Sequence, residues 1–438
     1  MTSACTRLRS VLGLVGLPGL LAAASLYGCH TGAPSPPPPP PPVVQPIAPA
    51  ALPPPGALPA SPAALPPAAS PAAAGASPVA AAVGPSPRTP LVDASTHVVI
   101  AGLLRFSDPS LAGFRVEDRR DVELGRVLVA SGVPAAQVTT LLDERATRAA
   151  VLEAVGRAAD ATPRGGTLLF YYAGHGIRTR QGDIAYVAYD TLGSDASRPG
   201  ISVEDLFAVL APRVVGKRVV LLGDCCHSGG LGDLAARLGT LGITALSLTS
   251  ADASNLSTGN WTYSQLLLEG LRGDPALDAN NDARVDLGEL EAGVRAAMRH
   301  REHQRSGANL SAVQPAALTV APRHGPPRAG AEAGQFMRDR HGQIVRVNRV
   351  DGAQATVRRY AYALSRDTMT PLSELTHLRS TRYPVGTELL VEWGGREWPA
   401  VVTAQEDDFA FITYPGWPHY WDEWILEDRV RRVVRLAP

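Results

Sequence analysis

Cysteine is scarce in this sequence, with four residues in a chain of 438. Their spacing provides neither a disulfide framework nor the paired motifs of a zinc site, which excludes a small disulfide-stabilised fold. Cys225 and Cys226 are adjacent, and a disulfide between neighbouring cysteines is strained, so we expect free thiols there. The other two, Cys5 and Cys29, lie in the amino-terminal segment.

An excess of charge of either sign is also absent, because 41 Lys and Arg residues balance 41 Asp and Glu residues. A chain without net charge does not attract nucleic acid or a membrane surface through its overall field, so we expect no nucleic-acid partner. The length is sufficient for two or three domains. The function must therefore be found in local groups of residues.

The amino terminus has the layout of a secretory signal. Arg7 and Arg9 precede an apolar stretch at residues 11–26, which is short for a membrane span and is interrupted by glycine and proline. The stretch ends in Leu-Tyr-Gly-Cys at Cys29, which resembles the bacterial lipobox, where the cysteine thiol is acylated. The resemblance implies a lipoprotein signal peptide at residues 1–29 and a secreted protein anchored to a membrane on the periplasmic side of the cell envelope. An ordinary signal peptide or an uncleaved anchor is the alternative.

Residues 30–94 contain a large share of the 39 prolines, in runs that alternate with alanine-rich, nearly uncharged stretches. Such a composition cannot bury enough apolar surface to form a packed core. We expect a disordered tether between the lipid anchor and the folded part of the chain.

Short apolar runs alternate with amphipathic segments across residues 95–322, which predicts an α/β domain with a mostly parallel sheet and helices on both faces. Sites in such sheets lie beyond the carboxyl ends of the strands, so the residues that follow each strand are the candidates for a site. The predicted strands are residues 97–104, 166–172, 218–223 and 243–248, and the predicted helices are residues 118–130, 147–159 and 202–210.

Two of these strand ends carry reactive residue types. Residues 171–176 read Tyr-Tyr-Ala-Gly-His-Gly, and residues 223–230 read Gly-Asp-Cys-Cys-His-Ser-Gly-Gly. The glycines let the backbone turn sharply beside His175 and after Cys226. A thiol needs a nearby base to become the reactive thiolate, and a histidine on a neighbouring strand end can supply it. His227 adjoins Cys226 and is badly placed as its base, so we expect it to shape the loop, and we expect Cys225 to be a small buried thiol.

The two motifs resemble those of the caspase and metacaspase family of cysteine peptidases, in which the histidine also lies about fifty residues before the cysteine. The resemblance spans residues 95–322 and implies a caspase-like catalytic domain with Cys226 as the nucleophile and His175 as the general base and acid. It also implies an oxyanion site made by the backbone N–H groups of Gly176 and Cys226. This chemistry requires no cofactor.

The same resemblance suggests what the enzyme cuts. In metacaspases, an aspartate two residues before the nucleophile lines the pocket for the residue before the cut, and Asp224 matches it, which implies a preference for Arg or Lys. Asp118 matches the second pocket aspartate. The alternative is that Asp224 caps the turn after its strand and that Asp118 caps a helix. Ala173 departs from the family, which usually carries serine there.

Residues 278–289 carry oxygen-bearing side chains at the positions that surround calcium in an EF-hand. Ala283 departs from the pattern, because glycine usually makes the sharp turn there. Calcium is therefore a candidate cofactor, and a solvated loop that caps the following helix is the alternative. The candidate ligands are Asp278, Asn280, Asp282, Asp286 and Glu289.

A linker at residues 323–334 precedes a region of short alternating strands. Residues 381–438 contain five of the six tryptophans and resemble Tudor and chromo-barrel domains, and residues 335–380 look like a weaker copy. The resemblance implies small SH3/Tudor-like β-barrels that bind a peptide or protein partner. The candidates for an aromatic cage are Tyr414, Trp417 and Trp421.

The leading hypothesis is an endopeptidase that cuts polypeptide substrates after Arg or Lys. A second hypothesis is a catalytically silent caspase-like scaffold that binds proteins through the tryptophan-rich module. A third is a peptidase that cuts after Asp, which would need a basic pocket where the sequence has Asp224.

Overall fold

The structure is a computed structural model that describes residues 88–117, 119–179, 182–192, 200–255, 257–360, 366–379 and 381–437. The signal segment with Cys29, most of the proline-rich tether, and Asp118 lie outside these residues, so the predictions made for them stay predictions. None of the helices in the described part combines the length and apolar character needed to cross a membrane.

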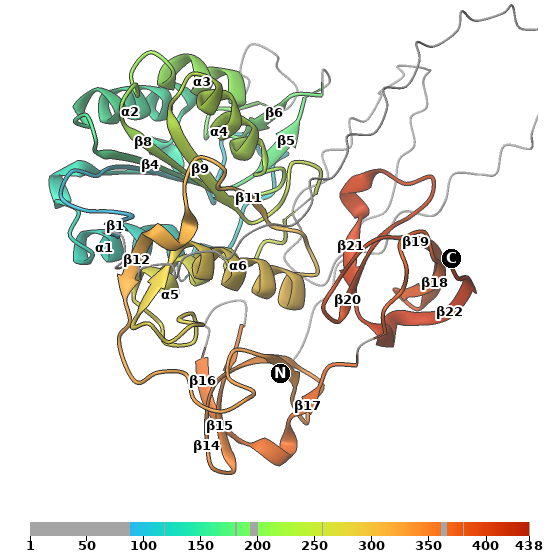
Figure 1. Cartoon of the computed structure of the whole chain (residues 1–438). Helices are drawn as coiled ribbons and strands as arrows, with labels where there is room; N and C mark the ends of the chain where they lie inside the picture. Colours follow the sequence, from blue (N-terminus) through green and yellow to red (C-terminus); the bar gives the residue numbers. More distant parts are fainter. Residues whose placement is uncertain are drawn as a thin grey trace, which may run out of the picture.

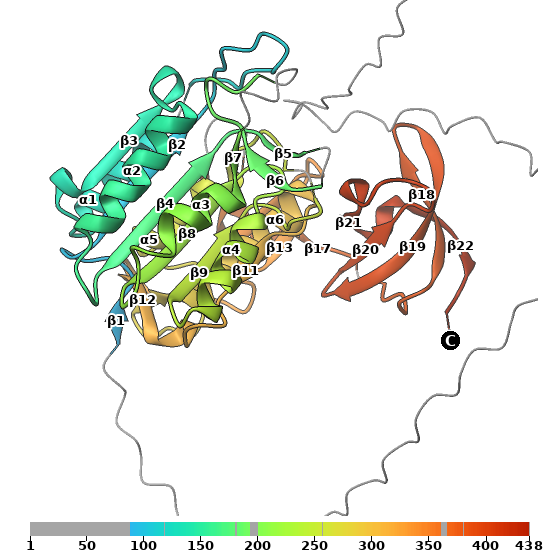
Figure 2. The same cartoon turned by 90° about the horizontal axis from the view of Figure 1, so that it is seen from above.

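The catalytic candidates belong to a six-stranded sheet with the strand order β11-β9-β8-β4-β2-β3 (Figures 1 and 2). Five strands are parallel, and β11 pairs with β9 in the antiparallel direction, so the predicted mostly parallel sheet is confirmed. The strands are β2 (His97–Gly102), β3 (Val138–Leu142), β4 (Thr167–Ala173), β8 (Arg218–Asp224), β9 (Thr244–Thr249) and β11 (Gly307–Asn309).

Helices cover both faces of this sheet, as the sequence predicts. In Figure 1 the helices α2, α3 and α4 lie above the sheet, and α1, α5 and α6 lie below it. The alternation of side chains along β4 explains the two layers, because Tyr171 packs into one buried cluster while Phe170 and Tyr172 pack into the other. The helices are α1 (Arg120–Ala130), α2 (Arg148–Ala161), α3 (Val203–Leu210), α4 (Gly230–Thr240), α5 (Thr262–Leu271) and α6 (Leu287–Glu302).

Side-chain caps fix where several of these helices begin. The Thr147 side chain accepts a hydrogen bond from the Ala150 N–H, as its position before the predicted helix suggests. Ser202 and Asp205 form a capping box at the start of α3. The pattern did not predict α4, because its three glycines lower the intrinsic helix propensity of an otherwise apolar segment.

Two small sheets flank the central one. One has the order β1-β12-β10, and the other, β5-β6-β7, follows His175 directly. Their strands are β1 (Thr89–Pro90), β10 (Arg284–Asp286), β12 (Leu318–Pro322), β5 (Gly176–Arg178), β6 (Ile184–Tyr186) and β7 (Ile201–Ser202). The 3-10 helices are Ala135–Gln137, Asp143–Arg145, Pro315–Ala317, Leu372–Glu374, His419–Trp421 and Glu427–Arg429.

The carboxyl-terminal third is β-rich, as expected, and contains two antiparallel five-stranded sheets. We call residues 336–379 the middle module and residues 381–437 the C-terminal module. The middle module has the order β16-β15-β14-β13-β17, and the C-terminal module has the order β21-β20-β19-β18-β22. The strands are β13 (Phe336–Arg338), β14 (Ile344–Asp351), β15 (Gln354–Arg359), β16 (Arg366–Pro371), β17 (Thr376–His377), β18 (Glu388–Trp393), β19 (Arg396–Glu406), β20 (Phe409–Thr413), β21 (Glu423–Ile425) and β22 (Val430–Arg435).

A buried ion network joins the middle module to helix α5 of the α/β domain. Glu269 on α5 lies 3.0 Å from a guanidinium nitrogen of Arg346 and 2.8 Å from one of Arg358. The side chains of Glu269 and Arg346 are both only 4% exposed. Charges buried to this extent are tolerated when they are paired, and they become costly when one partner is lost.

We predict that Glu269→Ala lowers the unfolding free energy by about 3–5 kcal/mol, because it removes the nearer carboxylate from the buried guanidinium of Arg346 and leaves it with Asp274, 3.6 Å away. The measurement is denaturant unfolding. The control is Glu388→Ala, which removes an exposed partner of Arg435 and should cost far less, because solvent screens exposed ion pairs. Equal costs for the two variants would contradict the prediction.

Candidate active site

The two strand-end motifs meet at one edge of the central sheet. Strands β4 and β8 are parallel neighbours, with Ala173 opposite Asp224, so His175 and Cys226 each follow the same edge by two residues. Residue 176 must be glycine, because a Cβ atom there would lie 1.7 Å from the carbonyl oxygen of Cys226. The backbones of the histidine and cysteine motifs are therefore in direct contact.

The imidazole of His175 is held in one orientation. Its ring contacts the rings of both Phe106 and Phe114, at centroid distances of 4.9 and 4.6 Å, and these two rings also contact each other. Its Nε2 atom lies 2.7 Å from the carbonyl oxygen of Ala112. A carbonyl oxygen only accepts, so Nε2 carries the proton and donates it, which leaves Nδ1 as an acceptor.

Burial lowers the pKa of His175, and the hydrogen bond to the Ala112 carbonyl only partly opposes this shift. The neutral imidazole is therefore the dominant form at neutral pH. A neutral histidine with an unprotonated ring nitrogen has the properties of a general base.

The Cys226 thiol is nearly enclosed, with the residue 3% exposed. Its Sγ atom accepts a hydrogen bond from the backbone N–H of Ser257 at 3.2 Å. The thiol in turn donates to the Ser257 carbonyl oxygen at 3.6 Å, so the backbone of Ser257 holds the sulfur through both of its polar groups. Cys225 is also a free thiol and packs in the apolar cluster beneath α2, α3 and α4, as predicted. Burial raises the pKa of Cys225 well above its usual value.

His227 organises the turn that follows Cys226. Its backbone has φ of 55°, and its N–H donates to the Asn255 carbonyl oxygen at 2.9 Å. Its Nδ1 atom lies 3.0 Å from the Ala253 carbonyl oxygen. His227 thus ties the cysteine turn to residues 253–255.

A pocket opens between the strand ends and a loop that we call the pocket loop, residues 250–255 and 257–261. Its lining includes Ala173, Gly174 and Asp224 from the strand ends and residues 257–261 from the pocket loop. The remaining lining residues are Leu104, Phe114, Arg115 and Cys225. The pocket therefore adjoins both motifs and contains the predicted specificity residue.

Asp224 is buried in the wall of this pocket. The Ser264 hydroxyl donates to its Oδ2 atom at 2.5 Å, and the Tyr171 hydroxyl lies 2.6 Å from the same Ser264 oxygen. Burial raises the pKa of Asp224 to about 7, although hydrogen bonds from Ser264 and Ser250 oppose the shift. The pocket role and the turn-capping alternative both stay predictions for this residue.

Sequence reasoning missed several groups at this edge. The Ala112 carbonyl and the rings of Phe106 and Phe114 lie in an irregular segment whose pattern gives no signal. The pocket loop follows β9, and the expectation that sites lie after strand ends would have found it if it had been applied to that strand.

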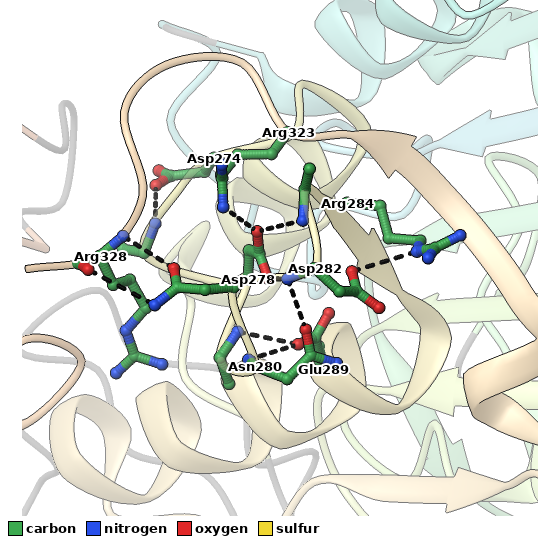
Figure 3. A network of polar contacts seen from close by, with 12 residues as sticks. Asp274, Asp278, Asn280, Asp282, Arg284, Glu289, Arg323 and Arg328 are labelled. Atoms are coloured by element: carbon green, nitrogen blue, oxygen red, sulfur yellow. Dashed lines mark hydrogen bonds and ion pairs between the residues drawn. The ribbon is translucent and has the colours of Figure 1, made fainter.

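The candidate calcium loop carries an extensive set of internal hydrogen bonds (Figure 3). Asp278 accepts from the backbone N–H groups of Asp282 and Ala283, both at 3.1 Å, and pairs with Arg323 at 2.5 Å. Ala283 adopts φ of 72°, the left-handed conformation for which glycine is usual. The guanidinium of Arg323 thus supplies positive charge beside the first carboxylate of the loop.

The remaining candidate ligands also have partners inside the protein. Asp286 and Glu289 form a reciprocal capping box at the start of α6, as the helix-capping alternative predicts. Glu289 also accepts from the backbone N–H groups of Ala279 and Asn280, and Asp282 pairs with Arg88 and Arg284. In the described ranges, no group of three or more His, Cys, Asp and Glu side chains is arranged to hold a metal ion. Calcium binding stays a prediction.

The cage candidates fall into two groups of ring contacts. Trp393 lies near both Tyr414 and Trp421, at centroid distances of 6.2 and 5.5 Å, whereas Trp417 packs edge-on against Trp398 at 5.8 Å. The Tyr414 hydroxyl donates to Glu423 at 2.7 Å. The structure therefore groups Tyr414 and Trp421 with Trp393 and places Trp417 beside another tryptophan.

The region that carries this site is similar to a known protein family and to several solved structures. Residues 110–319 match the family model of the peptidase C14 caspase domain. A structural-genomics target protein of Geobacter sulfurreducens is similar at 18% identity over 53% of this chain and 95% of its own, with a TM-score of 0.35. The Drosophila initiator caspase Dronc is similar at 12% identity over 51% of this chain and 82% of its own, also with a TM-score of 0.35. Caspase-1 of Spodoptera frugiperda is similar at 17% identity over 46% of this chain and 77% of its own, with a TM-score of 0.32. The search of curated proteins gave no match.

The raised pKa of Asp224 predicts a pH-dependent stability. The pKa of Asp224 is about 3.8 in the unfolded chain and about 7 in the folded protein. Below pH 4 the carboxyl is neutral in both states and the unfolding free energy is at its full value. As the pH rises to 7 the unfolded chain ionises first, so this stability is lost. We expect Asp224→Asn to raise the unfolding free energy by roughly 3–4 kcal/mol at pH 8 and to give no comparable gain at pH 4. Denaturant unfolding at the two pH values measures it, and an equal effect at both would contradict it.

Proposed function

Residues 110–319 are a caspase domain of the peptidase C14 family, and on this basis we propose that the chain is a cysteine endopeptidase that cuts polypeptides after Arg or Lys. The single observation that carries the proposal is the state of His175. Its Nε2 proton is held by the Ala112 carbonyl, so Nδ1 is the basic nitrogen, and the histidine motif is in backbone contact with the cysteine motif at one edge of the sheet. A base beside a thiol is what nucleophilic catalysis requires.

In the proposed reaction, Nδ1 of His175 takes the proton of the Cys226 thiol, and the sulfur forms a bond to the carbonyl carbon of the substrate. The N–H groups of Gly176 and Cys226 stabilise the oxyanion. The C–N bond then breaks, and the leaving amine takes the proton from His175. Water, deprotonated by the same histidine, attacks the thioester, releases the carboxylic acid and restores the thiol.

The proposed preference for Arg or Lys rests on Asp224. It is the acidic group among the lining residues of the pocket, and a bound guanidinium or ammonium would favour its ionised form. A preference for Asp would instead need the Arg115 side chain to dominate the pocket, and a buried carboxylate beside it opposes that outcome.

Further parts of the proposal concern location and partners. The lipidated Cys29 and the tether would hold the enzyme on the periplasmic side of the cell envelope, and the C-terminal module would bind a peptide or protein. A catalytically silent scaffold is the alternative function. The aromatic rings of Trp393, Tyr414 and Trp421 lie beside Glu423, and this grouping favours a binding role for the C-terminal module.

Peptide cleavage by the full chain tests the proposal. We expect cleavage of fluorogenic peptides that end in Arg or Lys, little cleavage after Asp, and a loss of at least about 1,000-fold in kcat for Cys226→Ala. Glu388→Gln, which removes an exposed charge outside the lining residues of the pocket, is the control and should keep its activity. If no peptide is cleaved and Cys226 does not react with an alkylating reagent, the protein is a scaffold.

The pH profile tests the role of Asp224 separately. Its pKa of about 7 means that the carboxylate becomes neutral as the pH falls below 7, so the attraction for a basic side chain is lost. We expect KM for an Arg peptide to rise by up to about tenfold per pH unit below pH 7. In Asp224→Asn this dependence should disappear. A peptide with an uncharged residue before the cut is the control, and an equal pH dependence for both peptides would exclude Asp224 as its cause.

A further inference from the structure

The four residues that end α6 and follow it, residues 302–305, lie between the pocket loop and the C-terminal module. Their side chains alternate between the two neighbours. Glu302 and Gln304 face the pocket loop, whereas His303 and Arg305 face the C-terminal module. His303 adopts the left-handed conformation with φ of 58°, which ends the helix and begins this alternation.

The contacts on the catalytic side are hydrogen bonds to the pocket loop. Glu302 accepts from the Thr258 hydroxyl at 2.7 Å and from the Asn260 amide at 2.9 Å. Gln304 accepts from the Thr258 N–H at 2.9 Å and donates to the Ser257 hydroxyl at 3.1 Å. Both side chains are buried. They therefore fix the backbone that donates to the Cys226 sulfur and lines the pocket.

The contacts on the other side hold the C-terminal module. The backbone N–H of Trp424 donates to the backbone carbonyl oxygen of His303 at 2.8 Å. The Arg305 guanidinium lies 3.8 Å from the centre of the Phe411 ring. One turn earlier on α6, the buried Arg299 pairs with Glu406 and Asp407. Figure 1 shows the module, in red, beside the end of α6.

One hydrogen bond joins the pocket loop to the module directly. The Asn255 side-chain amide donates to the Asp422 carbonyl oxygen at 2.9 Å, and Asn255 is buried. The pocket loop is thus held from two directions, by residues 302–305 and by the module itself.

We propose that docking of the C-terminal module positions the pocket loop for substrate binding, with Glu302 and Gln304 as the positioning residues that transmit it. The inference rests on the proposed peptidase function and adds a regulatory role for the module in cis. A loop that is already ordered costs less conformational entropy when a substrate binds, so docking lowers KM.

The geometry favours positioning over obstruction. Every residue that lines the pocket precedes residue 262, so the docked module does not fill it. The pocket loop contacts Cys226 through Ser257, whose backbone N–H donates to Sγ at 3.2 Å and whose carbonyl oxygen accepts from the thiol at 3.6 Å. The module therefore acts on the site through the loop that it holds.

The experiment is a double-mutant cycle in the full chain. Glu406→Gln with Asp407→Asn weakens docking, and Gln304→Ala breaks the link to the loop. With an Arg peptide, we expect each change to raise KM by about tenfold and to leave kcat within about twofold, because the catalytic pair is untouched. Together they should raise KM little more than either does alone, since both interrupt one connection.

Alkylation of Cys226 by iodoacetamide, followed by mass spectrometry, gives a readout independent of cleavage. Release of the pocket loop uncovers the sulfur, so alkylation should become several-fold faster in the same variants. Glu388→Gln, which removes an exposed charge elsewhere on the module, is the control and should change neither KM nor alkylation. Thermal melting confirms that each variant is folded. If the docking variant, Glu406→Gln with Asp407→Asn, is unfolded, the single change Asp407→Asn takes its place.

Several outcomes would overturn the inference. Faster peptide cleavage by the docking variant would show that the module blocks the site. An unchanged KM, or fully additive effects of the two changes, would show that docking and the pocket loop are independent. If the unmodified chain cleaves no peptide, the proposed peptidase function fails. The coupling between module docking and the pocket loop is refuted separately, by an alkylation rate that stays unchanged in the folded docking variant.

Discussion

The parallel pairing of β4 with β8 is the constraint on which the site depends. Because these strands are neighbours in register, the residues that follow them emerge side by side at one edge of the sheet. The histidine and cysteine motifs need no long-range side-chain contact to find each other, since backbone hydrogen bonds in the core already align them. The helices on both faces bury these strands, and this burial keeps the edge fixed.

The sequence was sufficient to predict the elements that carry periodic signals. The apolar strands, the capped start of α2 and the motifs around His175 and Cys226 follow local rules, and the family match covers the region where those motifs lie. The partners of His175 and Cys226, the proposed catalytic pair, were not predictable in this way. Ala112 contributes a backbone carbonyl, which any residue possesses, so its side chain gives no indication of its role.

Contacts between distant segments were equally hidden from sequence reasoning. The hydrogen bonds of Gln304 with the pocket loop join residues more than forty positions apart, and no spacing rule predicts them. The candidate calcium loop shows the reverse case. Its oxygen-bearing side chains have a recognisable spacing, but in the folded protein they serve backbone N–H groups and arginines. A pattern of residue types specifies which bonds are available, and the fold decides which are made.

The alternation of residues 302–305 restricts how the chain can vary. Side chains two positions apart face the same neighbour, as they do in a β-strand. One side of the segment contacts the pocket loop, and the other contacts the C-terminal module. Inserting or deleting a single residue there would exchange the sides and direct histidine and arginine at the pocket loop. We therefore expect related chains that keep this arrangement to tolerate changes of residue type in the segment more readily than changes of its length.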